Sequence, residues 1–234
     1  MTTPETRRSN TLRSESAYIS RVIRPSARRF LVSDLDNTII DSRARFNRAV
    51  SEATGYPSTV AQQLSNTKSL TRDQRNRFYD VFLSGKYMDL DIPVRGSVET
   101  LGKLRSLGFG IIYLTGRHHS REESLKYETL KTLSRYGYPM PDRSNVMLYM
   151  KPNKTSPTNE YKRSVLERLA KNMNVVVGVD DEVNDLQVMA DLVPLVIGLY
   201  LSLQARHEIS SSLKIPLAKD WFEVESTMAQ RGLI

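Results

Sequence analysis

The sequence of 234 residues predicts an α/β fold, with a parallel sheet that carries helices on both faces and a helical insertion. Two observations predict the sheet: five short apolar runs are bounded by turn residues, and amphipathic helical patterns of about 10–16 residues separate them. A third observation predicts the insertion. About fifty residues between Asp41 and Pro93 contain helical patterns but no convincing strand.

Five apolar runs define the expected strands. The first stops abruptly at Asp34, and each has the length and the turn-rich borders that are typical of a buried strand. The five runs are Phe30–Ser33, Gly110–Leu114, Val146–Met150, Val175–Val179 and Pro194–Tyr200.

Helical patterns occupy the intervals between these strands. In residues 97–107 leucines recur on one face, and a glycine marks the C-terminal end. A capping box at Ser120–Glu123 opens another helix, which ends before Gly137. Further helices are expected at 157–172, with a proline at its first position, at 183–191 and, in the C-terminal tail, at 219–230.

The interval after Asp41 contains its own helical faces. Phe46, Ala49 and Val50 share one face, and a capping box at Thr71–Gln74 opens a second apolar helix. We therefore predict three parts of the chain. They are a basic arm at 1–28, a core domain formed by 29–41 and 92–234, and a helical insertion at 42–91.

Composition narrows the possible function classes. The absence of cysteine excludes a disulfide scaffold, a zinc ribbon, an iron–sulfur site and a thiol nucleophile. The longest apolar stretch, Leu192–Leu201, is far shorter than the ~20 residues that a membrane span needs. No apolar secretory segment follows the first residue. We therefore expect a cytoplasmic protein without a membrane partner.

The net charge of +8 is concentrated near the N-terminus. Residues 1–29 contain seven Arg and two Glu, so the rest of the chain has an excess of only three basic residues. This Ser/Thr/Arg-rich arm has little to bury and is expected to be flexible. Three interpretations stay open: a solvated tail, a phosphate-binding arm that would accept nucleic acid, or an organelle transit peptide.

Polar residues gather at the carboxyl ends of the predicted strands, where open α/β sheets bind their ligands. The groups are Asp34, Asp36 and Thr38; Thr115, Gly116 and Arg117; the lysines Lys151, Lys154 and Lys162; and Asp180, Asp181 and Asp185. Carboxylates are the hard oxygen ligands that Mg²⁺ prefers, and hydroxyl and ammonium groups bind phosphate. The sequence therefore predicts a site for a phosphate and a magnesium ion.

Four motifs occur in a familiar order. They resemble the motifs of the haloacid dehalogenase (HAD) superfamily of phosphohydrolases. In this sequence they read FLVSDLDNT, IIYLTGR, a lysine near YKRSVLERL, and VVVGVDDEVND. The resemblance covers roughly residues 30–200 and implies a Rossmann-like core with Mg²⁺ as cofactor. It also implies that the insertion at 42–91 is a small C1-type cap, which closes over the site and selects substrates.

The resemblance implies a role for each catalytic residue. Asp34 would be the nucleophile that forms an aspartyl-phosphate. Asp36 would be the acid that protonates the leaving oxygen and then the base that activates water. Thr115 would donate to a phosphoryl oxygen, and Lys162 would neutralise charge on the nucleophile and on the transferring group.

The resemblance also implies a metal site. Mg²⁺ would lie between Asp34, the backbone carbonyl of Asp36 and Asp181, with Asp180 or Asp185 in support.

The sequence leaves the roles of several residues open. Lys162 is favoured as the motif lysine because it starts the helix that leads into the acidic strand, but Lys151 directly follows a strand. Arg117 could grip a phosphate or pair with a nearby acid. Thr38 would fix the catalytic loop. The expected substrate-binding residues are Thr38, Gly116, Arg117 and Lys151.

Three functions are compatible with these features. A small cap favours a phosphomonoester of a small metabolite. The Thr-Gly-Arg and Asp-Asp motifs are also similar to the phosphatase half of polynucleotide kinases, which removes 3′-phosphates, and the basic arm would suit nucleic acid. The residues outside the arm show no basic track with interleaved aromatic residues. The third possibility is a catalytically idle scaffold, against which the intact acidic residues argue.

Overall fold

A six-stranded sheet forms the centre of the protein in the computed structural model, which describes residues 27–61, 67–119, 124–142 and 144–234. The strand order is β5-β4-β1-β6-β7-β8, and every neighbouring pair is parallel. The strands are β1 (Arg29–Ser33), β4 (Phe109–His118), β5 (Val146–Lys151), β6 (Val175–Asp180), β7 (Leu195–Leu199) and β8 (Leu217–Ala218).

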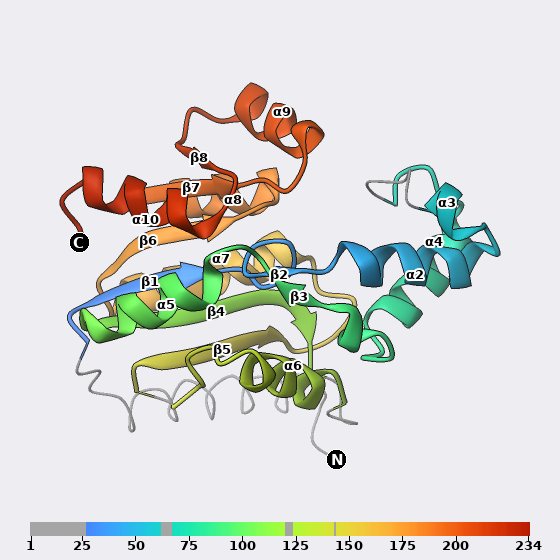
Figure 1. The fold of residues 1–234 in the computed structure, drawn as a ribbon, viewed down its shortest axis with the longest axis horizontal. Coiled ribbons are helices and arrows are strands. Elements are labelled where there is room, and N and C mark those ends of the chain that lie inside the picture. The colour runs from blue at the N-terminus through green and yellow to red at the C-terminus, as the bar shows by residue number, and fades with distance from the viewer. Residues whose placement is uncertain (1–26, 62–66, 120–123, 143) are drawn as a thin grey trace, which may run out of the picture.

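Helices cover both faces of this sheet, which confirms the predicted α/β fold (Figure 1). Successive side chains of a strand point to opposite faces, so Leu31 of β1 packs in one core and Phe30 and Val32 pack in the other. The helices of the first core are α5 (Ser97–Ser106), α6 (Ser124–Arg135) and α10 (Trp221–Gln230). Those of the second core are α7 (Thr158–Ala170), α8 (Val183–Ala190) and α9 (Leu203–Ser212).

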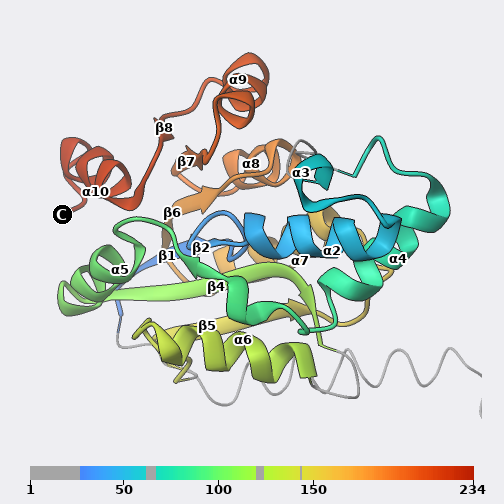
Figure 2. The ribbon, with the colours of Figure 1, turned by 45° about the vertical axis from the view of Figure 1, so that its right-hand side comes forward.

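The insertion leaves and rejoins the core through a short antiparallel ribbon of β2 (Ile40–Asp41) and β3 (Ile92–Pro93). Between these strands lie α2 (Arg43–Thr54), α3 (Ser58–Ala61), α4 (Arg72–Phe82) and the 3₁₀ helix η1 (Met88–Leu90). The helices α2 to α4 lie beyond the carboxyl ends of the strands (Figure 1), and α2 and α4 pack side by side (Figure 2).

The insertion has a small core of its own. Ala49, Val50 and Phe78 are buried there, and the rings of Phe46 and Phe78 meet edge to face with centroids 5.0 Å apart. The predicted capping box of α4 is present, since Thr71 and Gln74 each bond the other's backbone N–H. The insertion can therefore keep its shape through its own apolar contacts.

Some local features differ from the sequence predictions, and some predictions lie outside the part described. β4 continues through the Thr-Gly-Arg motif to His118, because pairing with β5 resumes after a register shift. Pro157 is the residue before α7, not its first position. Helix α9 and strand β8 were not predicted, and α9 buries only Ile209, so it lacks a clear apolar face. The capping box at Ser120–Glu123 lies outside the described residues, as do arm residues 1–26.

No helix in the described ranges is long and apolar enough to cross a membrane.

The C-terminal helix α10 anchors the loop that follows β1. Trp221, the only tryptophan of the chain, is fully buried, and its indole Nε1–H donates to the carbonyl oxygen of Thr38 over 2.7 Å. Ile39, the residue after Thr38, packs in the same hydrophobic core as Trp221. The last helix therefore stabilises a loop that lies almost two hundred residues earlier in the chain.

Replacing Trp221 by phenylalanine should lower the free energy of unfolding by about 1–3 kcal/mol, because the buried carbonyl of Thr38 loses its indole donor. Urea denaturation followed by far-ultraviolet circular dichroism measures the change. The control is Tyr127→Leu on α6, where the side chain is 65% exposed, and it should change stability by less than about 0.5 kcal/mol. An equal decrease in the free energy of unfolding in both variants would show that the indole hydrogen bond does not stabilise the fold.

Candidate active site

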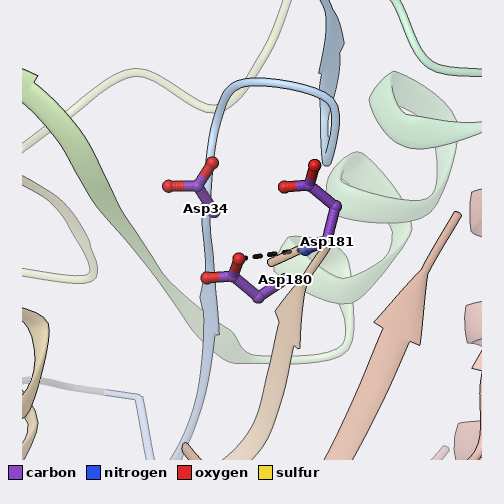
Figure 3. Close-up of side chains that lie close together, drawn as sticks. All are labelled: Asp34, Asp180 and Asp181. Carbon is purple, nitrogen blue, oxygen red and sulfur yellow. Dashed lines mark hydrogen bonds between the residues drawn. The ribbon is translucent and has the colours of Figure 1, made fainter. Parts of the chain in front are cut away.

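Three carboxylates meet at the carboxyl edge of the sheet because their strands are neighbours. β1 and β6 run parallel with Ser33 opposite Val179, and the Asp34 N–H donates to the Val179 carbonyl over 3.0 Å. Asp34 therefore follows β1 at the level where Asp180 ends β6 and Asp181 follows it (Figure 3). One oxygen from each of these three side chains lies within 4.8 Å of the others.

The loop after β1 is a tight turn that aims Thr38 at this cluster. The Leu35 carbonyl accepts the N–H groups of Thr38, Ile39 and Ile40 at 3.3, 3.0 and 2.9 Å. Asn37 takes the left-handed conformation with φ of 57°, which asparagine tolerates better than most residues. The Thr38 hydroxyl then donates to Asp181 Oδ1 over 3.2 Å, so the loop orients one carboxylate of the cluster.

Lys162 enters the same cluster from α7. Its Nζ lies 2.9 Å from Asp34, 2.7 Å from Asp180 and 2.7 Å from Asp185, and its side chain is only 2% exposed. Burial would lower the pKa of this ammonium, but the three carboxylates raise that pKa well above its ordinary value. Lys162 therefore stays charged and joins Asp34, which follows β1, to Asp180 at the end of β6 and to Asp185.

The carboxylates outnumber the single ammonium group, and the pKa values of Asp34, Asp180 and Asp181 are raised. Burial raises the pKa of Asp34 to about 6, although Lys162 opposes the rise. Burial, followed by repulsion from neighbouring carboxylates, raises the pKa of Asp180 and of Asp181 well above the ordinary range, and Lys162 offsets only part of this rise.

The donor set fits a hard divalent cation. Asp34, Asp180 and Asp181 offer only oxygen atoms, they lie within coordination range of a shared ion, and they are crowded enough for a positive charge to relieve their repulsion. Asp185 lies outside this group and pairs with Lys162. The side chain of Asp36 is also outside this group and pairs with Arg117, so two of the predicted metal residues are not among the three clustered carboxylates.

The Asp36 carboxylate lies between two guanidinium groups. Arg117 donates to both of its oxygens, from Nε at 2.9 Å and from Nη2 at 2.8 Å, and Arg45 Nη2 donates to Oδ1. Burial would raise the pKa of Asp36, but Arg117 and Arg45 outweigh it and keep that pKa well below its usual range. The geometry thus pairs Arg117 with an acid, which was one of its two predicted roles.

Arg45 and Asp91, which contact Asp36 or its partner Arg117, were not predicted as site residues from the sequence. Both are fully buried, and Arg45 Nε lies 2.8 Å from Asp91 Oδ1. One signal was available for Arg45. It lies four residues before the buried Ala49 on α2, so a charged residue occupies the apolar face of a helix. Nothing in the spacing of Asp91 indicates its partners.

The remaining predicted residues lie on β4 and at the end of β5. Thr115 is buried on β4, and its Oγ1 accepts the Arg117 N–H over 3.2 Å. Gly116 packs on α7, because a Cβ atom there would lie 3.0 Å from Thr158 Cγ2. Lys151 donates to the Ser156 carbonyl over 2.9 Å, so it braces the loop before α7 and does not enter the acidic cluster.

The chain matches a family model described as "HAD superfamily, subfamily IIIB (Acid phosphatase)" over residues 9–197. No curated protein sequence matches it.

Solved structures share the fold at low sequence identity. A predicted phosphatase from Clostridium acetobutylicum is 15% identical, covers 88% of this chain and 100% of its own, and has a TM-score of 0.62. A predicted phosphoglycolate phosphatase from Haemophilus somnus is 14% identical over 88% and 99% of the two chains, with a TM-score of 0.61. Protein tyrosine kinase A from Mycobacterium tuberculosis is 14% identical over 87% and 98%, with a TM-score of 0.63.

Proposed function

The chain belongs to the HAD superfamily, subfamily IIIB, and we propose that it hydrolyses small phosphomonoesters with Mg²⁺ through a phosphoryl intermediate on Asp34. The phosphatase class follows from the family. The observation that carries the mechanism is the buried Lys162, which bridges Asp34, Asp180 and Asp185 beside the third carboxylate of the cluster, Asp181.

Asp34 is the proposed nucleophile. Its carboxylate attacks phosphorus, an O–P bond to Asp34 forms, and the bond from phosphorus to the leaving oxygen breaks. The ammonium of Lys162, 2.9 Å away, offsets the negative charge that Asp34 and the phosphoryl group bring together. Water then attacks phosphorus, the bond to Asp34 breaks, and the free carboxylate and inorganic phosphate are released.

Asp36 is proposed to move the protons in both steps. It gives a proton to the leaving oxygen and takes one from the attacking water. Its low pKa leaves it ionised, which suits the second step. A phosphate dianion bound beside it would raise that pKa, since a like charge favours protonation, and would so prepare Asp36 for the first step.

Asp34, Asp180 and Asp181 are the residues proposed to hold Mg²⁺, with the backbone carbonyl of Asp36 as a further ligand. The bound ion would neutralise charge on the phosphate and fix its orientation. Thr38 supports this site by orienting Asp181, and Thr115 is proposed to donate to a phosphoryl oxygen.

The insertion supports a small substrate. Its helices lie beyond the strand ends at which Asp34 and Asp180 stand, and Lys154 of the loop before α7 pairs with Asp80 of α4. This contact ties the insertion to the core on the side of α7, which restricts access for a bulky polymer end. We therefore interpret residues 42–91 as a cap that selects small phosphomonoesters.

Removing divalent metal should abolish hydrolysis of p-nitrophenyl phosphate, and added Mg²⁺ should restore it, because the single ammonium of Lys162 cannot offset both the clustered carboxylates and a bound phosphate. The measurement is the release of nitrophenol after EDTA treatment, before and after excess Mg²⁺. The matching binding test is a rise in melting temperature with Mg²⁺ that Asp181→Asn reduces. Full activity in metal-free buffer would contradict the metal assignment.

A substrate panel decides between a small ester and a nucleic acid end. We expect small phosphomonoesters to have a higher kcat/KM than 3′-phosphorylated oligonucleotides. Removal of residues 2–26 should leave kcat/KM for the best small ester unchanged within about twofold, with weak salt dependence. Preference for the oligonucleotide, with steep salt dependence that the deletion flattens, would instead support the 3′-phosphatase alternative.

A further inference from the structure

Two buried arginines and two aspartates form a second charged cluster beside the proposed metal site. We call Asp36, Arg45, Asp91 and Arg117 the charge square. The side chains of Arg45, Asp91 and Arg117 are at most 1% exposed, and that of Asp36 is 20% exposed. Two positive and two negative groups balance each other, so the square is neutral as a unit.

The four residues come from four separate elements. Asp36 belongs to the loop after β1, and Arg45 lies on α2 just after the insertion begins. Asp91 lies between η1 and β3, where the insertion ends, and Arg117 lies on β4. The square therefore joins both ends of the insertion to the loop that carries the proposed proton-transfer residue.

Charges of opposite sign alternate around the square. Asp36 accepts from Arg117 Nε and Nη2 at 2.9 and 2.8 Å and from Arg45 Nη2. Asp91 accepts from Arg45 Nε at 2.8 Å and from Arg117 Nη2 at 3.2 Å. Asp91 thus aligns both guanidinium groups, which in turn approach the Asp36 carboxylate from two directions.

Each arginine makes one further hydrogen bond outside the square. Arg117 Nη1 donates to Thr129 Oγ1 over 3.1 Å, and Arg45 Nη1 donates to the Phe82 carbonyl over 3.0 Å. The Arg45 guanidinium also packs 4.1 Å from the centroid of the Phe82 ring. Both guanidinium groups are at most 1% exposed, whereas the Asp36 side chain between them is 20% exposed, so we place their effect on the reaction through Asp36.

We infer that Arg45 and Arg117 are positioning residues that fix the Asp36 carboxylate in one orientation for its proton transfers, and that Asp91 aligns both arginines. The inference rests on the proposed function of Asp36. Three charge-assisted hydrogen bonds prevent the carboxylate from rotating, and a misplaced acid or base loses much of its catalytic effect. Arginine suits this role because its planar fork binds two carboxylates in fixed directions, whereas a lysine ammonium is a point charge.

A double-mutant cycle tests the inference with the full chain. Arg45→Met should lower kcat for an alkyl phosphate by about 10- to 100-fold, with KM changed by less than about threefold, because the Asp36 carboxylate becomes free to rotate. In the Asp36→Asn background the same substitution should cost no further activity beyond about twofold. The matched control, Arg48→Met on the exposed face of the same helix, should leave kcat unchanged.

Leaving groups give a second readout that a merely structural role would not change. Arg45→Met and Asp36→Asn should both slow alkyl phosphates more than 2,4-dinitrophenyl phosphate, whose leaving group needs no proton. An equal loss for both substrates, a loss that adds fully to that of Asp36→Asn, or a rise in kcat would each overturn the inference.

A charge-balanced variant guards against misfolding. Arg45→Met leaves two buried carboxylates with one arginine, whereas Arg45→Met/Asp91→Asn keeps the Arg117–Asp36 pair neutral. Its circular dichroism spectrum should match the wild type, and its kcat for the alkyl phosphate should fall as in Arg45→Met. Wild-type kcat in this folded variant would overturn the role of Arg45, whereas activity that survives Asp34→Asn would overturn the proposed function itself.

Discussion

The Asp34→Asn variant is expected to lose at least about four orders of magnitude in kcat for every phosphomonoester, because an uncharged amide cannot attack phosphorus. Asparagine has nearly the same shape as aspartate, and it removes a charge from a cluster in which burial already raises the pKa of Asp34 to about 6. The fold should therefore persist. Steady-state kinetics measures the loss, and circular dichroism checks that the variant is folded.

Rapid acid quenching separates the loss of the nucleophile from a loss of metal binding. Wild-type protein mixed with a ³²P-labelled substrate should retain label on the protein, whereas Asp34→Asn should retain none. The matched control is Asp191→Asn, an exposed residue whose side chain pairs with Arg163 at the surface, and it should behave as the wild type in both assays. Retention of wild-type kcat by Asp34→Asn would show that another group attacks phosphorus.

The central part of the fold could be predicted because strand ends and acidic residues coincide in the sequence. The run Phe30–Ser33 stops at Asp34, and Val175–Val179 stops at Asp180. In a parallel sheet the carboxyl ends of all strands lie on one edge, so the sequence predicted that these two residues lie on the same edge. The structure brings them together through the direct pairing of β1 with β6.

The charge square could not be predicted in the same way. Its members are brought together by the return of the insertion to the core, and the sequence distance from Asp36 to Asp91 carries no periodicity that indicates contact. Helix α9 was missed for another reason. Only Ile209 is buried on it, so tertiary contacts and a serine N-cap, not an apolar face, determine where it forms.

The length of β4 shows how partner strands override local signals. Gly116 is a common turn residue, and the sequence therefore predicted a loop after Leu114. The structure continues the strand to His118, because β5 supplies hydrogen-bond partners beyond the register shift. Thr115 and Arg117 consequently belong to a strand, and both side chains are buried.

Lys162→Met is expected to lower kcat by about three orders of magnitude, because Asp34, Asp180 and Asp185 then share a buried site without their ammonium. The methionine fills the same volume, so packing of α7 is preserved. Repulsion among the carboxylates should raise the pKa of Asp34 further and leave less of the nucleophilic carboxylate at neutral pH. Steady-state kinetics at saturating Mg²⁺ measures the effect.

Lys151→Met is the matched control for this prediction. Lys151 is also a lysine that lies close to the site, but its ammonium donates to the Ser156 carbonyl at 2.9 Å and to Thr158 Oγ1 at 3.4 Å. Its loss should loosen the loop before α7 and reduce kcat by less than about tenfold, with most of the effect in KM. If Lys151→Met cost as much in kcat as Lys162→Met, the lysine that neutralises the phosphoryl group would be Lys151, and the ammonium of Lys162 would serve only to stabilise the buried carboxylates.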